Sequence, residues 1–186
     1  MSIKQINKRE YFMKVLAFAA SNSKKSINKK LVTHAVTLLE GVTVEMLDIN
    51  DYEMPLYSAD REEDNGIPTL ATQFLEKIAQ SDGVVISFAE HNGTYTAAYK
   101  NLFDWASRVN PKVFQGKPLI YLSTSPGLGG AKSVLASAVN SAQFFDGDIR
   151  GSLSVPAFYD NYDDGKGEII DRTIKSELSA VMQLLR

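Results

Sequence analysis

From residue 14 onward the chain alternates between short apolar runs and amphipathic stretches. Runs typical of buried or half-buried strands lie at residues 14–20, 42–49, 83–88, 118–124 and within 149–156. Stretches with apolar residues at helical spacing follow them, at 26–39, 67–81, 95–109, 131–144 and 169–185. This alternation predicts an α/β fold with a doubly wound, five-stranded parallel sheet of order 2-1-3-4-5 and helices on both faces.

Two segments fall outside this alternation. Residues 1–12 are polar and lack the apolar core of a secretory signal, and Met13 directly precedes the first apolar run. We therefore expect an N-terminal extension at 1–12, a single domain at 13–186 and a cytoplasmic location. The connection at 50–66 is long, acidic and marked by prolines, and such loops are usually functional or mobile.

Composition and charge narrow the classes of function. Apolar residues make up 44% of the chain, yet no run approaches the roughly 20 apolar residues of a membrane span. The net charge is −2 and the basic residues are scattered, so we expect neither a membrane nor a nucleic-acid partner. The absence of cysteine excludes disulfides and thiolate chemistry, and the distance between His34 and His91 argues against a metal site. A reaction catalysed by this chain would therefore need a bound cofactor or carboxylate side chains.

The loop after the first strand is rich in hydroxyl and amide groups. Ser21, Ser23, Ser26 and Asn28 lie where a helix begins, and its first N–H groups and dipole favour an anion. The loop has neither the P-loop motif nor the GxGxxG fingerprint, so a phosphomonoester fits better than ATP or a dinucleotide. The alternative is a cluster of helix-capping residues with nothing bound.

The loop after the third strand, residues 89–95, combines polar groups with an aromatic ring. Asn92 and Gly93 tolerate positive φ and predict a chain reversal, and Thr94 is expected to be the helix N-cap. Main-chain donors beside Tyr95 suit a flat heteroaromatic ring that takes up negative charge on reduction, which a flavin does. Asn92 and Gly93 are also compatible with a plain turn, and Trp105 in the next helix with a core or subunit contact.

The loop after the fourth strand, residues 125–130, contains Gly127, Gly129 and Gly130. Glycines occur where a backbone approaches a ligand closely or adopts positive φ, although this loop is equally compatible with a flexible connection. The loops after strands 1, 3 and 4 converge at the carboxyl edge of the predicted sheet. Together they favour a bound mononucleotide.

Three motifs resemble those of the NAD(P)H-dependent FMN reductases, a flavodoxin-like family that includes chromate, quinone and azo-compound reductases. Residues 20–28 resemble the pattern GS-x-R-x-x-S-F/Y-N, and 123–130 resemble S-x-S-P-G-x-x-G-G. The most specific match is 89–105, AEHNGTYTAAYKNLFDW, against PEYNGSYPGALKNAIDW. Pro55, Leu56, Tyr57 and Asp60 also resemble the family's segment after strand 2, so the similarity spans about 14–130.

The resemblance implies a flavodoxin-like fold, bound FMN, NADPH or NADH as co-substrate, and a quinone, free flavin or other small electrophilic acceptor. It also implies a homodimer or homotetramer, in which the 50–66 loop borders the pocket of a neighbouring subunit. The residues implied to hold the phosphate are Ser21, Ser23, Ser26, Ile27 and Asn28. Those implied to border the isoalloxazine are Glu90, His91, Asn92, Gly93 and Tyr95, with Ser125, Gly127 and Gly130 on the other side.

Three departures from the family pattern bear on the site. Ser23 replaces the usual arginine, which predicts weaker FMN binding unless Lys24 or Lys25 reaches the phosphate. Ala89 replaces a proline, and His91 replaces an aromatic residue. His91 is a candidate proton donor to a reduced quinone oxygen, and the alternative is that it only replaces the aromatic residue in packing.

Two other functions are compatible with these residues. A flavodoxin-like electron carrier would pass single electrons between proteins without reacting with a nicotinamide, but its Thr-rich phosphate loop and strongly acidic surface are not prominent here. A nonredox protein could retain the fold with a repurposed pocket, and Ser23 and His91 keep that reading open.

Overall fold

The computed structural model describes residues 12–186, which form a five-stranded parallel sheet. Its order is β2-β1-β3-β6-β7, which is 2-1-3-4-5 along the chain, as predicted. The strands are β1 (Met13–Ala20), β2 (Val42–Leu47), β3 (Gly83–Phe88), β6 (Pro118–Thr124) and β7 (Asp148–Val155). Of the expected extension at 1–12, all but Phe12 lies outside the described residues.

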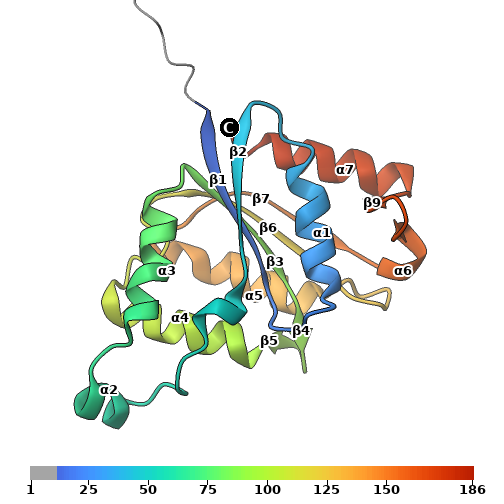
Figure 1. The fold of residues 1–186 in the computed structure, drawn as a ribbon. Helices are drawn as coiled ribbons and strands as arrows, with labels where there is room; N and C mark the ends of the chain where they lie inside the picture. The colour runs from blue at the N-terminus through green and yellow to red at the C-terminus, as the bar shows by residue number, and fades with distance from the viewer. Residues whose placement is uncertain (1–11) are drawn as a thin grey trace, which may run out of the picture.

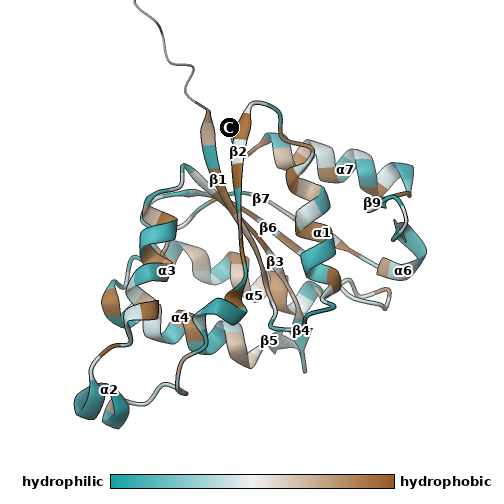
Figure 2. Ribbon diagram, viewed as in Figure 1, coloured by the Kyte–Doolittle hydropathy of each residue, from teal (hydrophilic) through white to brown (hydrophobic). Residues whose placement is uncertain are grey.

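Helices cover both faces of the sheet (Figure 1). Side chains of β1 alternate between the two cores: Val15 belongs to the core under α1 (Ile27–Val36) and α7 (Arg172–Gln183). Phe18 belongs to the core under α3 (Thr69–Ala79), α4 (Ala97–Val109) and α5 (Lys132–Ala142). Figure 2 shows the apolar strands between helices that turn polar surfaces to solvent. The central strands β1, β3 and β6 are buried on both faces because they are apolar on both sides, whereas the edge strands β2 and β7 carry polar residues and are partly exposed.

The start of α4 differs from the sequence prediction. Residues Glu90–His91 (β4) and Thr94–Tyr95 (β5) pair as a short antiparallel hairpin, so the helix begins at Ala97 rather than at residue 95. The expected N-cap at Thr94 is therefore wrong. Thr96 caps the helix instead, because its hydroxyl accepts from Tyr99 N.

The last helix also begins later than expected. The hairpin of Tyr162–Asp163 (β8) and Glu168–Ile169 (β9) precedes it, and α7 starts at Arg172 with Asp171 as its N-cap. Ile170 lies within the stretch expected to be helical, but it precedes the helix and is 48% exposed. The short elements η2 (Gln143–Phe145) and α6 (Phe158–Asn161) were not predicted, because three or four residues are too few for a helical period.

The connection at 50–66 contains η1 (Ile49–Tyr52) and α2 (Ala59–Asn65). Helix α2 buries no side chain and projects from the body of the molecule (Figure 1). The connection is fastened to α4 at Pro55, whose carbonyl accepts from Trp105 Nε1 at 2.7 Å. Because Trp105 is only 1% exposed, the structure favours the core reading of this residue. No helix within residues 12–186 is long and apolar enough to cross a membrane.

Candidate functional site

The three predicted loops meet at the carboxyl edge of the sheet and are joined there by hydrogen bonds. The buried side chain of Asn28, in α1, donates to Thr124 O at 3.1 Å and accepts from Ser87 Oγ at 2.8 Å and Thr124 N at 3.1 Å. Thr96 Oγ1 donates to Ala20 O at 3.0 Å. The ends of β1, β3 and β6 are therefore held in register with the start of α1.

The first loop presents backbone donors at the N-terminus of a ten-residue helix. Ser26 is the N-cap and accepts from Lys29 N at 3.3 Å, while Ser21 Oγ accepts from Ser23 N at 3.3 Å. Several other amide N–H groups of the loop have no acceptor among residues 12–186: those of Lys24, Lys25, Ile27 and Asn28. These donors, with the helix dipole, form a cradle that suits a phosphate.

The cations near this loop differ in their availability. Lys29 pairs with Asp48 at 2.7 Å, and this hydrogen bond together with the backbone N–H of Asn50 holds the pKa of Asp48 below its usual value. Lys24 and Lys25 are exposed and make no ion pair with any described residue. They are therefore the cations closest along the chain that remain available to an anion.

The second loop reverses as expected. Asn92 and Gly93 have φ of 52° and 80°, so both adopt the left-handed conformation of a tight hairpin turn. A Cβ on Gly93 would meet nothing within 4 Å. The Glu90 carboxylate accepts from Val134 N at 2.9 Å, which ties the hairpin to the first turn of α5. His91 is exposed at the hairpin.

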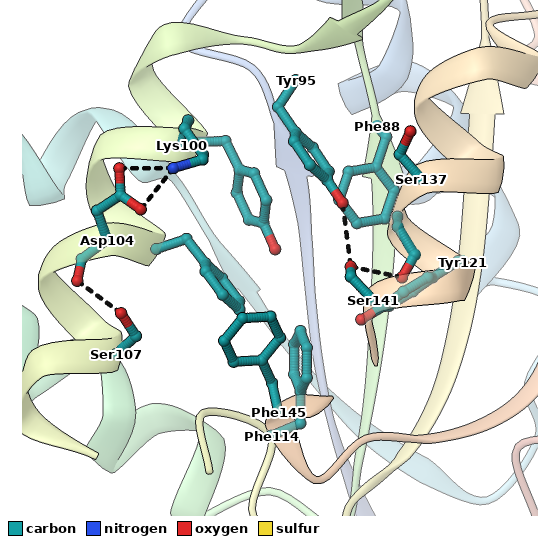
Figure 3. Close-up of a pocket in the computed structure, with 13 residues that line it drawn as sticks. Phe88, Tyr95, Lys100, Asp104, Ser107, Phe114, Tyr121, Ser137, Ser141 and Phe145 are labelled. Atoms are coloured by element: carbon teal, nitrogen blue, oxygen red, sulfur yellow. Dashed lines mark hydrogen bonds and ion pairs between the residues drawn. The ribbon is translucent and has the colours of Figure 1, made fainter. Parts of the chain in front are cut away.

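Tyr95 belongs to this loop, but its ring packs beneath it. Its centroid lies 5.8 Å from that of Phe88 and 5.5 Å from that of Tyr99, and its hydroxyl is 3.3 Å from Ser141 Oγ. Figure 3 shows the ring pointing into a cavity between α4 and α5. Burial raises the pKa of Tyr95, so the phenol stays neutral.

The glycines of the third loop have different surroundings. A Cβ on Gly127 or Gly129 would meet nothing within 4 Å, so the loop leaves open space above both. Gly130 has φ of +60°, and a Cβ there would crowd the Ser154 hydroxyl and lie 3.2 Å from Pro156 N. Gly130 is therefore required by backbone packing, whereas Gly127 and Gly129 leave room for a ligand.

A cleft lies beside the first loop, on the side of the sheet where β2 ends. The cleft, of about 300 Å³, is bounded by Asn22 of the first loop, by the segment following β2, and by Ala97, Ala98 and Asn101 of α4. The unpaired N–H groups at the start of α1 fit a phosphate. The open space beside Gly127 and Gly129, together with this adjoining cleft, fits a flat ring, so the whole arrangement fits a mononucleotide. No group of three or more His, Asp or Glu side chains within residues 12–186 is placed to hold a metal ion.

Of the residues that join the loops, Asn28 was predicted as a site residue, but Ser87, Thr96 and Thr124 were given no role from the sequence. All three are buried, and their hydroxyls bind Asn28 of α1, Ala20 at the end of β1 and Val155 at the end of β7. A signal for two of them was present, because Ser87 and Thr124 are polar residues at or near the ends of otherwise apolar strands. Their partners could not be identified without the tertiary structure.

Comparison with known proteins places this fold and loop arrangement in a family. The profile of the NADPH-dependent FMN reductases matches residues 13–156, and the chain belongs to this family. The solved structure of FerB, a flavoenzyme NAD(P)H:(acceptor) oxidoreductase from Paracoccus denitrificans, is similar with a TM-score of 0.74 and 27% identity. That similarity covers 93% of this chain and 94% of FerB.

Sequence relatives carry related names. An NADPH:quinone oxidoreductase of Arabidopsis thaliana is 33% identical over 65% of this chain, and a quinone reductase of Escherichia coli K12 is 32% identical over 64%. The matched regions span only 62% and 65% of those two proteins. A 2-hydroxy-1,4-benzoquinone reductase of a Burkholderia species is 29% identical over 91% of this chain and 92% of its own length.

Proposed function

We propose that this protein is an FMN-containing oxidoreductase that transfers electrons from NADPH or NADH to quinones, free flavin or other small electrophilic acceptors. The observation that carries the proposal is the Asn28-centred junction of three loops beside unpaired N–H groups at the start of α1. Family membership and the names of the quinone-reducing relatives support it.

The phosphate of FMN would lie at the first loop. Its proposed ligands are the hydroxyls of Ser21, Ser23 and Ser26 and the backbone N–H groups of Ile27 and Asn28. The Asn28 side chain has another role, because its amide already binds Thr124 and Ser87. Its contribution to the phosphate is therefore through its backbone N–H and through the shape of the loop that its side chain holds.

The isoalloxazine would lie between the second and third loops. Glu90, His91, Asn92 and Gly93 would border one side, with Tyr95 supporting the hairpin from below, and Ser125, Gly127 and Gly130 would border the other. Bound FMN supplies the two-electron chemistry by which NAD(P)H, a proton and a quinone become NAD(P)+ and a hydroquinone. Main-chain donors of the hairpin would stabilise negative charge on the reduced ring, and exposed His91 could deliver a proton to the acceptor oxygen.

An absorbance spectrum of the purified protein, followed by anaerobic titration with NADPH and NADH, tests the proposal. We expect a flavin spectrum, after addition of FMN if needed, that bleaches with reduced nicotinamide and returns when 1,4-benzoquinone is added. Bound flavin that does not bleach with either nucleotide would instead indicate an electron carrier. Failure to bind FMN in the titration would indicate a nonredox protein with a repurposed pocket.

We also propose a homodimer or homotetramer that works in the cytoplasm. Large apolar side chains beside the site support self-association, because Leu56 and Leu128 are 68% and 84% exposed. Leu128 belongs to the third loop and Leu56 to the connection at 50–66, so a neighbouring subunit could complete the pocket. Light scattering coupled to size-exclusion chromatography gives the mass, and a monomer at micromolar concentration would contradict the proposal.

A further inference from the structure

A second cavity lies between α4 and α5, under the hairpin of the candidate flavin site (Figure 3). Its volume is about 330 Å³, within the roughly 300–1,000 Å³ of small-molecule sites. Seven aromatic side chains line it, from the strands, from α4 and from the segments that follow α4 and α5. Of the residues assigned above to the flavin site, Tyr95 alone reaches it, so the two sites are adjacent but separate.

Two hydroxyl groups in this cavity lack partners. Tyr99 and Tyr121 are only 4% and 1% exposed, yet neither phenol oxygen makes a hydrogen bond with any atom of residues 12–186. Both rings lie edge-on to Phe88, with centroids 5.4 Å and 4.9 Å away, so the phenols flank the same ring. Neither oxygen is sealed inside the protein, because within residues 12–186 the one fully enclosed polar side-chain atom without a partner is His34 Nε2. Both hydroxyls therefore open onto the cavity, where a ligand can reach them.

These hydroxyls are available as donors. Burial raises the pKa of Tyr99 and of Tyr121 well above the usual value for a phenol, so both keep their protons over the physiological range. Neutral phenols deep in an aromatic cavity suit an uncharged oxygen acceptor, such as a carbonyl or hydroxyl group. An apolar side chain from another protein could fill the volume but would leave both O–H groups unpaired.

The entrance of the cavity does not select for charge. Ser137 and Ser141 of α5 lie on one side, and Lys100 and Asp104 of α4 on the other. Lys100 Nζ lies 2.6 Å and 2.8 Å from the two carboxylate oxygens of Asp104, so its charge is already compensated. An anion would gain little from this rim, whereas a neutral flat molecule can pass between the helices.

We propose that the α4/α5 cavity binds a neutral, planar aromatic compound of one or two rings that carries a carbonyl or hydroxyl oxygen. The oxygen accepts hydrogen bonds from Tyr99 and Tyr121, and the ring packs against Phe88, Phe114 and Phe145. This site is additional to the flavin site, and the inference does not depend on FMN binding or on redox activity.

Isothermal titration of the purified full-length protein with 2-naphthol tests the inference, in the absence of FMN and with FMN at saturation. This probe is a neutral bicyclic phenol that offers no quinone for reduction, so binding is measured apart from turnover. We expect one site per chain with a dissociation constant on the order of 100 μM or tighter, as ligands of this size allow. The constant should be the same with and without FMN.

Two pairs of variants locate the binding. The double variant Tyr99→Phe/Tyr121→Phe keeps both rings but removes the donors, and we expect about tenfold weaker binding from the lost hydrogen bonds. Tyr159→Phe, which removes an exposed phenol outside the cavity, is its control. Ser137→Phe should close the entrance and abolish binding. Ala136→Phe, at an exposed position of the same helix that does not line the cavity, should leave binding unchanged.

Circular dichroism of each variant establishes that it is folded. The inference is overturned if the wild-type protein does not bind 2-naphthol, or if Ser137→Phe and Ala136→Phe bind it equally well. Competition by FMN would assign the binding to the flavin face instead. Binding only after dissociation of a dimer would mean that a second copy of the chain fills the cavity. A protein that fails to bind FMN but binds 2-naphthol as described would contradict the proposed function alone.

Discussion

Two glycines in the loop after β6 differ in whether the structure has room for a side chain. Gly130 has φ of +60° and its Cα faces Ser154 and Pro156, so we expect Gly130→Ala to lower the free energy of unfolding by at least about 2 kcal/mol. Gly127 faces open space. We expect Gly127→Ala to change that free energy by less than about 0.5 kcal/mol while weakening FMN binding.

Urea denaturation and FMN titration of both variants measure these effects. The glycines are three residues apart in the same loop, so each variant is a matched control for the other. Equal losses of stability would contradict the packing argument at Gly130. Unchanged FMN affinity in Gly127→Ala would mean that the ring does not lie above this part of the loop.

His34 is buried in α1 with no partner for Nε2 within the described residues. Burial, and then the charge of Lys175 in α7, lower its pKa, while Glu168 in β9 opposes this effect. The unfolded chain therefore binds the proton more readily than the folded protein. The stability due to neutral His34 is complete above the ordinary pKa of about 6.5 and is lost as the pH falls through that value.

The variant His34→Leu removes this titration and keeps an apolar surface. Between pH 7.5 and 5.5, we expect the wild type to lose on the order of 1 kcal/mol more unfolding free energy than the variant. Carboxylates such as Asp48, whose pKa is lowered by Lys29, affect both proteins alike. Parallel stability curves for the two proteins would show that His34 does not titrate differently in the folded state.

The connection between β2 and α3 is held against α4 by the side chain of Asn101. Asn101 Oδ1 accepts from Tyr57 N at 2.8 Å, and its amide donates to Met54 O at 3.0 Å and Pro55 O at 3.2 Å. We expect Asn101→Ala to release this segment, because Tyr57 N and Met54 O lose their partners while Pro55 O keeps Trp105 Nε1 alone. Amide hydrogen exchange at Tyr57, whose N–H loses its acceptor, should accelerate by about tenfold or more.

The control is Arg108→Ala, on the same helix. Arg108 pairs with Glu62 of α2 through an exposed contact of 2.9 Å, and such surface pairs contribute little. Exchange of the Tyr57 amide should therefore stay close to that of the wild type. Equal acceleration in both variants would show that α2, rather than Asn101, holds the connection.

Element boundaries show which parts of the chain follow local rules. The expected strands at 83–88 and 118–124 agree with β3 and β6, because every residue of β3 and all but the first of β6 are buried in the sheet. The start of α4 was misplaced because Thr94 and Thr96 are both good N-caps, and hairpin pairing of Glu90 with Tyr95 decided between them. Local propensity could not distinguish them.

The effect of ligands on the stability of the whole protein tests whether the N–H groups at the start of α1 bind a phosphate. A ligand that binds only the folded state stabilises it, by about 2.7 kcal/mol at one hundred times its dissociation constant. We expect FMN to raise the melting temperature, and riboflavin at the same concentration to raise it much less because it lacks the phosphate. Equal shifts, measured by differential scanning fluorimetry, would contradict binding of the phosphate at the start of α1.

The sequence by itself determined the α/β alternation, the strand order through the rules of parallel sheets, and the three loops that meet at the carboxyl edge. It did so because burial on both faces of a strand leaves a readable apolar run, and turn and capping residues act locally. Only the tertiary structure decided that the Asn28 side chain binds Thr124, 96 residues away, and that the Tyr95 ring packs beneath the hairpin. It also revealed the unpaired phenols of the α4/α5 cavity. Partners so distant in the chain are brought together by the topology of the sheet, and no local pattern records which atoms will meet.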